Sequence, residues 1–521
     1  MGISSFPCRK CGTSSKDYIL TQISELDAFT LYDNDDPRVL LADVDTKTTQ
    51  IETLLASLAR QRTALKKRIN QLDAPVIRIL PAEVISEIFT FFSPPLSFND
   101  PCSLNPVTRS LFLGSVCKIW REIAWSTPRL WNSVHLELSR DRLLSQELIL
   151  DQWLSRAGSL PLSIRITCES SESMHWDLTP PTAIMEKVML HAGRCHTLDF
   201  RLPLSTVDCL RSATGHFTTL TSLSILPPGG QTARSRKTDA FSIAPQLQHV
   251  KLYSIYLSAT VLPWENVTHF EARHFYVDEC LEVLRRAPNL VRCEFPTIVD
   301  GDDSYSITKA PIFLPHLRKL LLGVERRAEI AIIFDLITAP GLVDLQLNII
   351  KCEIPHDSFT SFLDRSTCPL QRLSLLAPTL SHSQWMQYFQ ALPSLVHLQL
   401  DVSSLVEPIS EALNNQSLLA LTLPACSVSS TTSVLLPKLQ TLEYSGPRFF
   451  TFRSLETVLR SRWDTYLLKS VSLALFALST HEDKDLVSEI KSSLVKLQEL
   501  GMKLTIFEGG VDVLTGASGI V

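Results

Sequence analysis

The sequence predicts an α/β protein in which a long helix and a short all-helical segment precede a long array of strand–helix units. Three observations support this fold class. Apolar residues between Val39 and Leu72 follow alternating steps of four and three, which is typical of a long helix that packs along one seam. Apolar residues between Ile79 and Trp131 gather at the spacing of short amphipathic helices. Over the rest of the chain, a short leucine pattern returns about every 25 residues, which is typical of stacked repeats.

The composition is that of an ordinary globular protein, with 45% hydrophobic and 20% charged residues among 521. The net charge of −5 provides no general attraction to nucleic acid or to an anionic membrane, so we expect neither as a partner. The first residues, MGISSFPCRKCG, contain no apolar signal segment, and no apolar run is long enough to span a membrane. We therefore expect a cytoplasmic or nuclear protein.

Residues 1–36 form the flexible N-terminal part of the predicted organisation and contain the pair Cys8 and Cys11. A zinc site needs four ligands, and no second pair of Cys or His follows within the usual reach, so the pair favours a non-metal role. Most of the twelve cysteines lie inside apolar patterns, as Cys117, Cys195 and Cys293 do, which indicates buried free thiols. We expect no cofactor.

Residues 37–74 are expected to form one long helix that ends at Asp73-Ala74-Pro75. Its seam positions alternate by four and three residues: Val44, Thr48, Ile51, Leu55, Leu58, Arg62, Leu65, Ile69 and Leu72. This is the seam of a coiled coil or of a long helix packed on a partner. Because Thr48 and Arg62 interrupt the apolar seam, we expect the helix to fold back on its own chain near the following segment.

Residues 75–132 are expected to be all-helical. Leu80-Pro81 suits the first turn of a helix, because proline lacks only an N–H that would be unpaired there. Two groups of apolar residues then follow at the spacing of one helix face each: Ile85, Ile88, Phe89 and Phe92, and later Val116, Ile119, Trp120 and Ile123. Short helices this apolar cannot hide all their apolar surface against each other, which indicates an exposed partner site.

This segment resembles the F-box, a motif that reads approximately L-P-x-E-[VIL]-[LI]-x-x-I-[FL] and later V-C-[KR]-x-W. The matching stretches are LPAEVISEIF (Leu80–Phe89), VCKIW (Val116–Trp120) and a trailing PRLW (Pro128–Trp131). The link from Ser93 to Ser110 is longer and richer in proline than in the family. The resemblance implies docking onto the Skp-type adaptor of a cullin–RING ubiquitin ligase. The docking residues that it implies are Leu80, Pro81, Ile85, Ile88, Phe89, Val116 and Trp120.

Residues 133–521 are expected to form the array of strand–helix units. It opens with a strand in SVHLEL (Ser133 to Leu138), a helix from Leu143 to Gly158 and a strand in SLPLSIRITC (Ser159 to Cys168). A unit of L-x-x-L-x-L type then recurs, often after proline, as in PHLRKLLL (Pro315 to Leu322) and PSLVHLQL (Pro393 to Leu400). The copy QSLLALTLPAC (Gln416 to Cys426) fits best, because Cys426 takes the Asn/Cys position of leucine-rich repeats.

Thirteen copies can be counted, with intervals of 20 to 29 residues, and helix-like segments such as DECLEVLRRAP lie between them. Their first apolar residues lie at 195, 220, 247, 267, 290, 317, 342, 370, 395, 418, 439, 468 and 497. One strand and one helix cannot bury their apolar faces alone, but stacked neighbours share a continuous core. The array resembles leucine-rich repeats and implies an irregular horseshoe-shaped solenoid, with a globular α/β domain as the alternative.

No catalytic or phosphate-binding motif is present in the sequence, so we do not expect an enzyme. In each L-x-x-L-x-L strand the leucines point into the core and the alternate residues point away. We expect these outward residues to bind an unidentified protein substrate: Lys251, Tyr253, Glu271, Arg273, Asp344, Arg372, His397 and Asp401. With the F-box resemblance, this implies the substrate-recognition subunit of a Skp–cullin–F-box ubiquitin ligase. The alternative is a leucine-rich-repeat interaction scaffold whose F-box-like helices only cap the array.

Overall fold

The computed structural model of the chain describes residues 36–73, 80–93, 106–229, 237–299, 301, 305–324, 327–349, 354–376, 381–402, 413–423, 434–463, 468–476 and 484–516. The chain divides into two compact units, Met1–Ile88 and Phe89–Val521. The role predicted for Cys8 and Cys11 lies outside the described residues.

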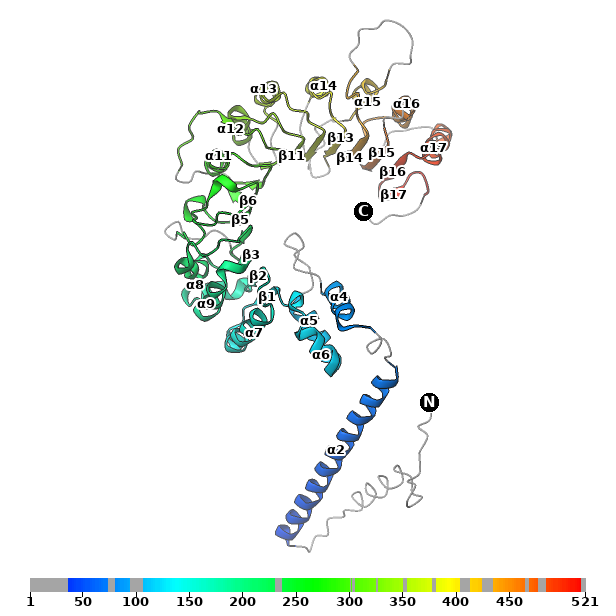
Figure 1. Cartoon of the computed structure of the whole chain (residues 1–521). Coiled ribbons are helices and arrows are strands. Elements are labelled where there is room, and N and C mark those ends of the chain that lie inside the picture. Colours follow the sequence, from blue (N-terminus) through cyan, green and yellow to red (C-terminus); the bar gives the residue numbers. More distant parts are fainter. Residues whose placement is uncertain are drawn as a thin grey trace. The chain divides into compact units, whose positions relative to one another are not determined.

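The long N-terminal helix is confirmed: α2 (Pro37–Asp73) runs for 37 residues without interruption (Figure 1). Several of its threonine hydroxyls donate hydrogen bonds to backbone carbonyls of the same helix. Thr46 Oγ1 donates to the carbonyl of Ala42 at 2.7 Å, and Thr63 Oγ1 donates to that of Ala59 at 2.8 Å. These residues therefore place no unsatisfied polar group on the helix, although threonine favours helices less than the surrounding leucines do.

Three helices follow in the described residues: α4 (Ala82–Phe92), α5 (Pro106–Val116) and α6 (Lys118–Trp125). The prediction of a single helix through Val116 and Trp120 is wrong, because the backbone at Cys117 is extended, with φ −157° and ψ 172°. Cys117 instead caps α6, its Sγ accepting the backbone N–H of Trp120 at 3.4 Å. The ring of Phe89 packs against Trp120 with centroids 4.8 Å apart, which joins the end of α4 to α6.

The Phe89–Val521 unit contains a sheet of 15 strands in its described residues, and the strand order follows the chain. All neighbours pair in parallel except β16 and β17. The strands are β1 (Ser133–Glu137), β2 (Leu162–Thr167), β3 (Cys195–Arg201), β4 (Ser222–Ile225), β5 (His249–Tyr253), β6 (His269–Phe275), β7 (Arg292–Ile298), β9 (Lys319–Val324), β11 (Asp344–Ile349), β12 (Arg372–Leu376), β13 (His397–Asp401), β14 (Thr441–Pro447), β15 (Ser470–Phe476), β16 (Lys503–Glu508) and β17 (Val511–Asp512). A separate pair is formed by β8 (Ile312–Phe313) and β10 (Ile337–Thr338).

Helices lie along one side of this sheet, and the other side carries no helix in the described residues (Figure 1). The helices of this layer are α7 (Leu143–Arg156), α8 (Ser173–Leu178), α9 (Thr182–Leu190), α10 (Leu204–Asp208), α11 (Val277–Arg286), α12 (Arg327–Leu336), α13 (His356–Ser366), α14 (His382–Ala391), α15 (Asn415–Ala420), α16 (Phe452–Trp463) and α17 (Lys484–Glu499). The core lies between the two layers, where Leu345, Leu347 and Phe362 are fully buried. The predicted mixed α/β class is confirmed at this level.

Each leucine pattern produces the alternation that was predicted from it. In β11 the residues Leu345, Leu347 and Ile349 are buried, whereas the intervening Asp344 and Gln346 are half-exposed. The strands are also joined by a repeated turn, in which two successive amides donate to one carbonyl of the preceding unit. The amides of Gln371 and Arg372 both donate to Val343 O at 2.9 Å, for example.

Two of the thirteen predicted copies are not strands as placed. The copy at Gln416–Cys426 begins instead as the helix α15, because Asn414 Oδ1 accepts the backbone N–H of Ser417 at 2.8 Å and caps it. β13 pairs directly with β14, so the sheet has no place for a strand between them. The residue taken as the start of the last copy, Leu497, belongs to α17, and the strand begins only at Lys503. The sheet also begins before position 195, because β1 and β2 are its first members.

Candidate functional site

The helix-free side of the sheet carries polar side chains in rows that run across the strands. Neighbouring parallel strands lie about 4.8 Å apart, so side chains at the same height on adjacent strands can touch. The register defines a first row of His249, His269, Arg292, Lys319, Asp344, Arg372 and His397. A second row, two residues further along each strand, consists of Lys251, Glu271, Glu294, Leu321, Gln346, Ser374 and Gln399. Together they form what we name the polar face.

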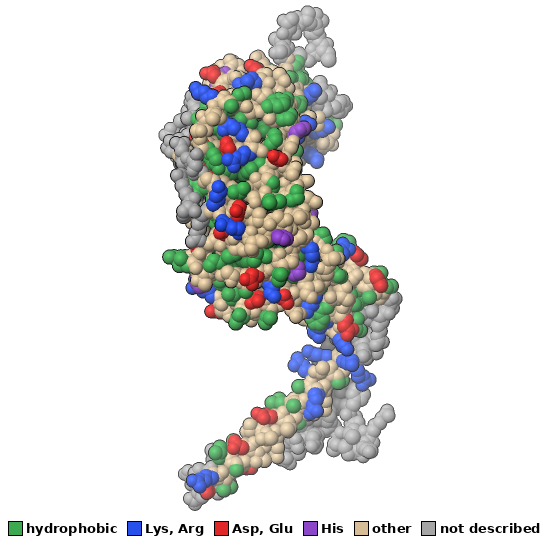
Figure 2. Space-filling view, turned by 60° about the vertical axis from the view of Figure 1, so that its left-hand side comes forward, with side chains coloured by type: hydrophobic (Ala, Val, Ile, Leu, Met, Phe, Trp, Pro, Cys, Tyr) green, Lys and Arg blue, Asp and Glu red, His purple; other side chains and the backbone are tan. Residues whose placement is uncertain are grey.

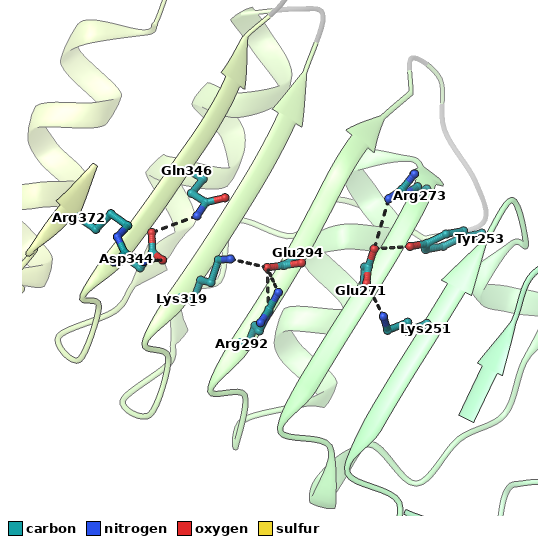
Figure 3. A network of polar contacts seen from close by, with 10 residues as sticks. All are labelled: Lys251, Tyr253, Glu271, Arg273, Arg292, Glu294, Lys319, Asp344, Gln346 and Arg372. Atoms are coloured by element: carbon teal, nitrogen blue, oxygen red, sulfur yellow. Dashed lines mark hydrogen bonds and ion pairs between the residues drawn. The ribbon is translucent and has the colours of Figure 1, made fainter. Parts of the chain in front are cut away.

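Glu271 is the centre of one cluster on the polar face (Figure 3). Its carboxylate lies 3.1 Å from Lys251 Nζ and 3.6 Å from Arg273 Nη2, and it accepts the hydroxyl proton of Tyr253. The guanidinium of Arg273 also covers the Tyr253 ring at 4.7 Å from its centroid. Burial raises the pKa of Tyr253, and the hydrogen bond to Glu271 raises it further. The phenol therefore stays protonated and acts as a fixed donor.

Glu294 is the centre of the next cluster and has only 7% of its surface exposed. Its Oε1 lies 2.8 Å from Arg292 Nη2 and 2.9 Å from Lys319 Nζ, so a cation of the same strand and a cation of β9 share one carboxylate oxygen (Figure 3). Burial alone would raise the pKa of Glu294, but hydrogen bonds and charges from Arg292 and Lys319 hold it below its ordinary value. This carboxylate stays ionised and fixes the side chains of β7 and β9 relative to each other.

Further along the rows the contacts become looser. Asp344 Oδ2 lies 3.5 Å from Arg372 Nη1, and its other oxygen accepts Gln346 Nε2 at 3.4 Å (Figure 3). His397 Nε2 lies 3.6 Å from Glu443 Oε1. Burial lowers the pKa of His397, and Glu443 opposes that shift only in part. The imidazole is therefore neutral at pH 7.

The structure thus brings the predicted substrate residues together in two groups. Lys251, Tyr253, Glu271 and Arg273 form one cluster, and Asp344 pairs with Arg372. His397 and Asp401 follow on β13, where both are half-exposed.

The sequence prediction of the site omitted His249 and His269, which lie on the strands of the first group, and Arg292 and Lys319, which lie between the two groups. All four lie just before the second apolar residue of their copies. Arg372 and His397 occupy that same position, so the signal was available in the sequence.

A shallow pocket of about 240 Å³ lies on the polar face over β5, β6 and β7. Its lining residues are His249, Val250, Lys251, His269, Phe270, Glu271, Arg292 and Glu294. The two imidazole rings lie 4.5 Å apart between centroids. Burial lowers the pKa of His269, and the charges of His249 and Arg292 lower it further. The pocket is therefore lined by two adjacent imidazole rings and by charges that are paired with one another, an arrangement suited to hydrogen bonding with another protein.

The predicted docking residues of α4–α6 divide into exposed and buried ones. Ile85 and Phe89 are 5% and 2% exposed, so they pack within the protein. Ile88 and Val116 are 51% and 44% exposed, and Pro81 is exposed as well. Leu80 and Trp120 are intermediate. Further exposed apolar side chains on these helices, which the prediction omitted, are Val84, Phe91, Leu111, Phe112 and Ile119.

The segment after α6 is tied to the first strand–helix unit. Trp131 is 1% exposed, and its Nε1 donates to Ala124 O at 2.7 Å. Its ring meets Trp153 of α7 edge to face with centroids 4.5 Å apart. Ser110 Oγ of α5 donates to Leu130 O at 3.0 Å. These contacts fix α5 and α6 against the edge of the sheet that begins with β1.

Charges of both signs are distributed over the described surface of the Phe89–Val521 unit. Figure 2 shows basic, acidic and hydrophobic side chains interspersed over the described part of the Phe89–Val521 unit, without a field of one charge on the face in view. In the described residues no His, Cys, Asp and Glu side chains form a group of three or more that suits a metal ion. The described helices include none with the length and hydrophobicity of a membrane span. No family model matches the chain, and no curated protein matches its sequence.

Proposed function

We propose that the chain is a non-catalytic substrate-recognition subunit of a Skp–cullin–F-box ubiquitin ligase. Residues 75–132 act as the F-box and dock onto a Skp-type adaptor, which connects the chain to a cullin–RING ligase. The strand–helix units act as an irregular leucine-rich-repeat solenoid, a horseshoe whose polar face binds a protein substrate. The ubiquitin chemistry belongs to the partners, and the complex works in the cytoplasm or nucleus.

The observation that carries the docking proposal is the exposed apolar surface of three short helices. Phe112 and Ile119 are 58% and 47% exposed, although both side chains are strongly apolar. Each such side chain contributes about 1.5–3 kcal/mol when a partner buries it fully, so several of them support a stable complex. Ile85 and Phe89 act indirectly in this proposal, because they pack inside and hold α4 in place.

The polar face supports the substrate part of the proposal. Many of its cations and anions are paired with one another, so they are held in place before a partner arrives. Such a surface suits a folded protein partner, whose polar groups can exchange for these ion pairs, and it does not suit lipid or a polyanion. The substrate residues proposed are those of the Glu271 cluster, the Asp344–Arg372 pair, His397 and Asp401.

The test is co-purification of the full chain with a recombinant Skp-type adaptor. Ile119→Asp places a charge on the exposed apolar face of α6 and is expected to weaken adaptor binding by at least about tenfold. The matched control is Glu122→Gln on the same helix, whose side chain is 62% exposed and pairs only loosely with Lys118 at 3.6 Å. Equal binding by wild type and Ile119→Asp, or no binding by either, contradicts the proposal.

A second candidate is an interaction scaffold in which α5 and α6 only cap the sheet. The contacts of Trp131 and Ser110 favour it, because an open sheet edge needs a cover for its apolar end. A pure cap predicts that Ile119→Asp changes no partner, whereas Trp131→Ala lowers the stability of the sheet. If Ile119→Asp abolishes adaptor binding without changing the stability of the protein, the result favours the F-box proposal.

A further inference from the structure

Although the sequence predicts that α2 folds back on its own chain, much of its seam is exposed in the structure, and we infer that two copies of this chain associate through α2, as an antiparallel two-helix coiled coil. The inference is independent of the proposed ligase function. It rests on two properties of α2 (Pro37–Asp73): an exposed apolar seam and an uneven distribution of charge along the helix.

The seam of α2 is mostly apolar, and most of its described positions are exposed to solvent, although Leu58 is half-buried. Its described positions, at steps of three and four, are Leu41, Val44, Thr48, Ile51, Leu55, Leu58, Arg62, Leu65 and Ile69. Leu41, Leu55 and Leu65 are each about 60% exposed. A helix that leaves such a stripe in water lacks the tertiary packing that normally stabilises helices. Burying the stripe against an identical helix supplies that packing.

The charges select the orientation of the second copy. The first half of the helix carries the acidic residues Asp43, Asp45 and Glu52 together with the basic residues Arg38 and Lys47. The second half carries Arg60, Arg62, Lys66, Lys67 and Arg68, and no acidic residue lies between positions 56 and 69. Figure 2 shows basic side chains gathered toward one end of α2, and acidic and basic side chains together toward the other. A parallel pair places the basic halves side by side, about 10 Å apart, where salt screens the repulsion only partly.

An antiparallel pair places each basic half against an acidic half. At full overlap, Leu55 of one copy faces Leu58 of the other, and Val44 faces Ile69. Arg62 then faces Ile51 of the second copy, one residue from the carboxylate of Glu52, and its long side chain can reach that group at the edge of the seam. In a parallel pair Arg62 faces Arg62. The polar residue that interrupts the seam is therefore compatible with the antiparallel arrangement and unfavourable in the parallel one.

The first experiment is sedimentation of the full chain over a range of concentrations around 1 µM. We expect a dimer for the wild type. Leu55→Asp places a charge at the centre of the seam twice per dimer and is expected to raise the dissociation constant about 100-fold or more. The control Thr53→Asp introduces the same charge on the outer side of α2, where Thr53 is exposed, and should leave the dimer intact. A monomeric wild type means that the chain itself covers the seam, and overturns the inference. An unchanged Leu55→Asp dimer places the interface elsewhere and overturns it too.

The second experiment tests the orientation in the wild-type protein and in one variant. Raising NaCl from about 50 mM to about 500 mM screens charge, so it weakens an antiparallel dimer and strengthens a parallel one. The variant V44C/I69C is oxidised and its cross-linked peptides are identified by mass spectrometry. Positions 44 and 69 lie about 37 Å apart within one helix, so a disulfide between them must join two copies. A disulfide joining position 44 to 69 supports the antiparallel pair. Disulfides joining 44 to 44 and 69 to 69 overturn it.

Discussion

Arg165 on β2 and Asp199 on β3 form an ion pair, with Nε and Oδ2 2.6 Å apart, whose side chains are only 2% and 3% exposed. The pair continues the second row of the polar face, because Asp199 is in register with Ser224, and Ser224 is in register with Lys251. The polar face thus changes character along the sheet. Its charges at β2 and β3 are buried, whereas from β5 onward charges such as Lys251 and Arg372 are half-exposed or exposed, although Glu294 is buried.

The buried pair should respond differently to single and double substitution. Asp199→Leu leaves the Arg165 guanidinium buried without its carboxylate and is expected to destabilise the protein by about 3–5 kcal/mol. The double variant R165M/D199L replaces both charges by apolar groups of similar volume and should recover most of that loss. Urea unfolding of the wild type, both single variants and the double variant measures the coupling. Asp151→Asn, which breaks the exposed contact with Lys187, serves as the control and should change the midpoint little. Additive effects of the two single changes would contradict this prediction.

His135 should make the stability of the protein depend on pH. Burial, together with the charges of Arg165 and Arg201, lowers its pKa from 6.5 to about 4. As the pH falls from 6.5 to about 4, His135 binds a proton in the unfolded chain but not in the folded protein, so the free energy of unfolding decreases. Above this window His135 contributes no pH dependence. Chemical unfolding of wild type and His135→Asn across the window measures the difference, which should shrink toward low pH. A constant difference refutes the assignment.

Ile85 and Ile88 should give different results when each is replaced by aspartate. Ile85 is 5% exposed, so Ile85→Asp buries a charge and should disrupt the packing of α4. Ile88 is 51% exposed, so Ile88→Asp should leave the fold intact and remove only adaptor binding. Circular dichroism and thermal unfolding report the first effect, and adaptor co-purification reports the second. An Ile88→Asp protein that is stable and still binds the adaptor excludes this face of α4 from docking.

Arg462 of α16 should contribute to stability far more than its neighbour Arg460. It is 1% exposed, and its guanidinium donates to the carbonyls of Leu421, Leu435 and Leu436 at 2.6, 2.7 and 3.0 Å. Burial lowers its pKa to about 10, which still leaves it charged at neutral pH. Arg462→Met removes the donors of three carbonyls and should cost about 3 kcal/mol or more.

The control for that change is Arg460→Met, because the Arg460 side chain is 59% exposed and pairs with Glu456 on the same helix. Urea unfolding should separate the two variants clearly. Hydrogen exchange should also become faster around Leu421 and Leu435 in Arg462→Met alone. Similar stability of the two variants would show that the three carbonyls find other donors.

The local sequence pattern correctly predicted most strands of the sheet, but it wrongly predicted a strand around Leu418. In β11 and β13 the leucines alternate with polar residues, and only a strand explains a period of two. Around Leu418, the pair Leu418 and Leu421 also fits helical spacing, and Asn414 with Ser417 provides a helix cap. Short apolar runs are ambiguous in this way, and here the neighbouring strands decide, since β13 and β14 already pair.

The members of the polar face could be predicted, but their pairing could not. Arg372 and Asp344 follow from the alternation of each strand taken alone. That Glu294 lies between Arg292 and Lys319 depends on the register of β7 with β9, which is set by contacts across the sheet. Likewise, helical spacing places Ile85 and Ile88 near one another on α4 without saying which of them is buried.

The pairing of each described strand with its neighbours in the chain has a consequence for how the protein is made. β3 pairs with β2 and β4, and β5 pairs with β4 and β6, so no strand of the parallel sheet awaits a partner from the far end of the chain. Contacts between segments close in sequence form quickly, because little chain entropy is lost in closing the loop between them. During synthesis from the N-terminus, each new strand can pair with the preceding strand, which is already folded. The connection between β13 and β14 is longer than the others between neighbouring strands of the described sheet. The ribosome must therefore synthesise more residues there before the next strand can pair.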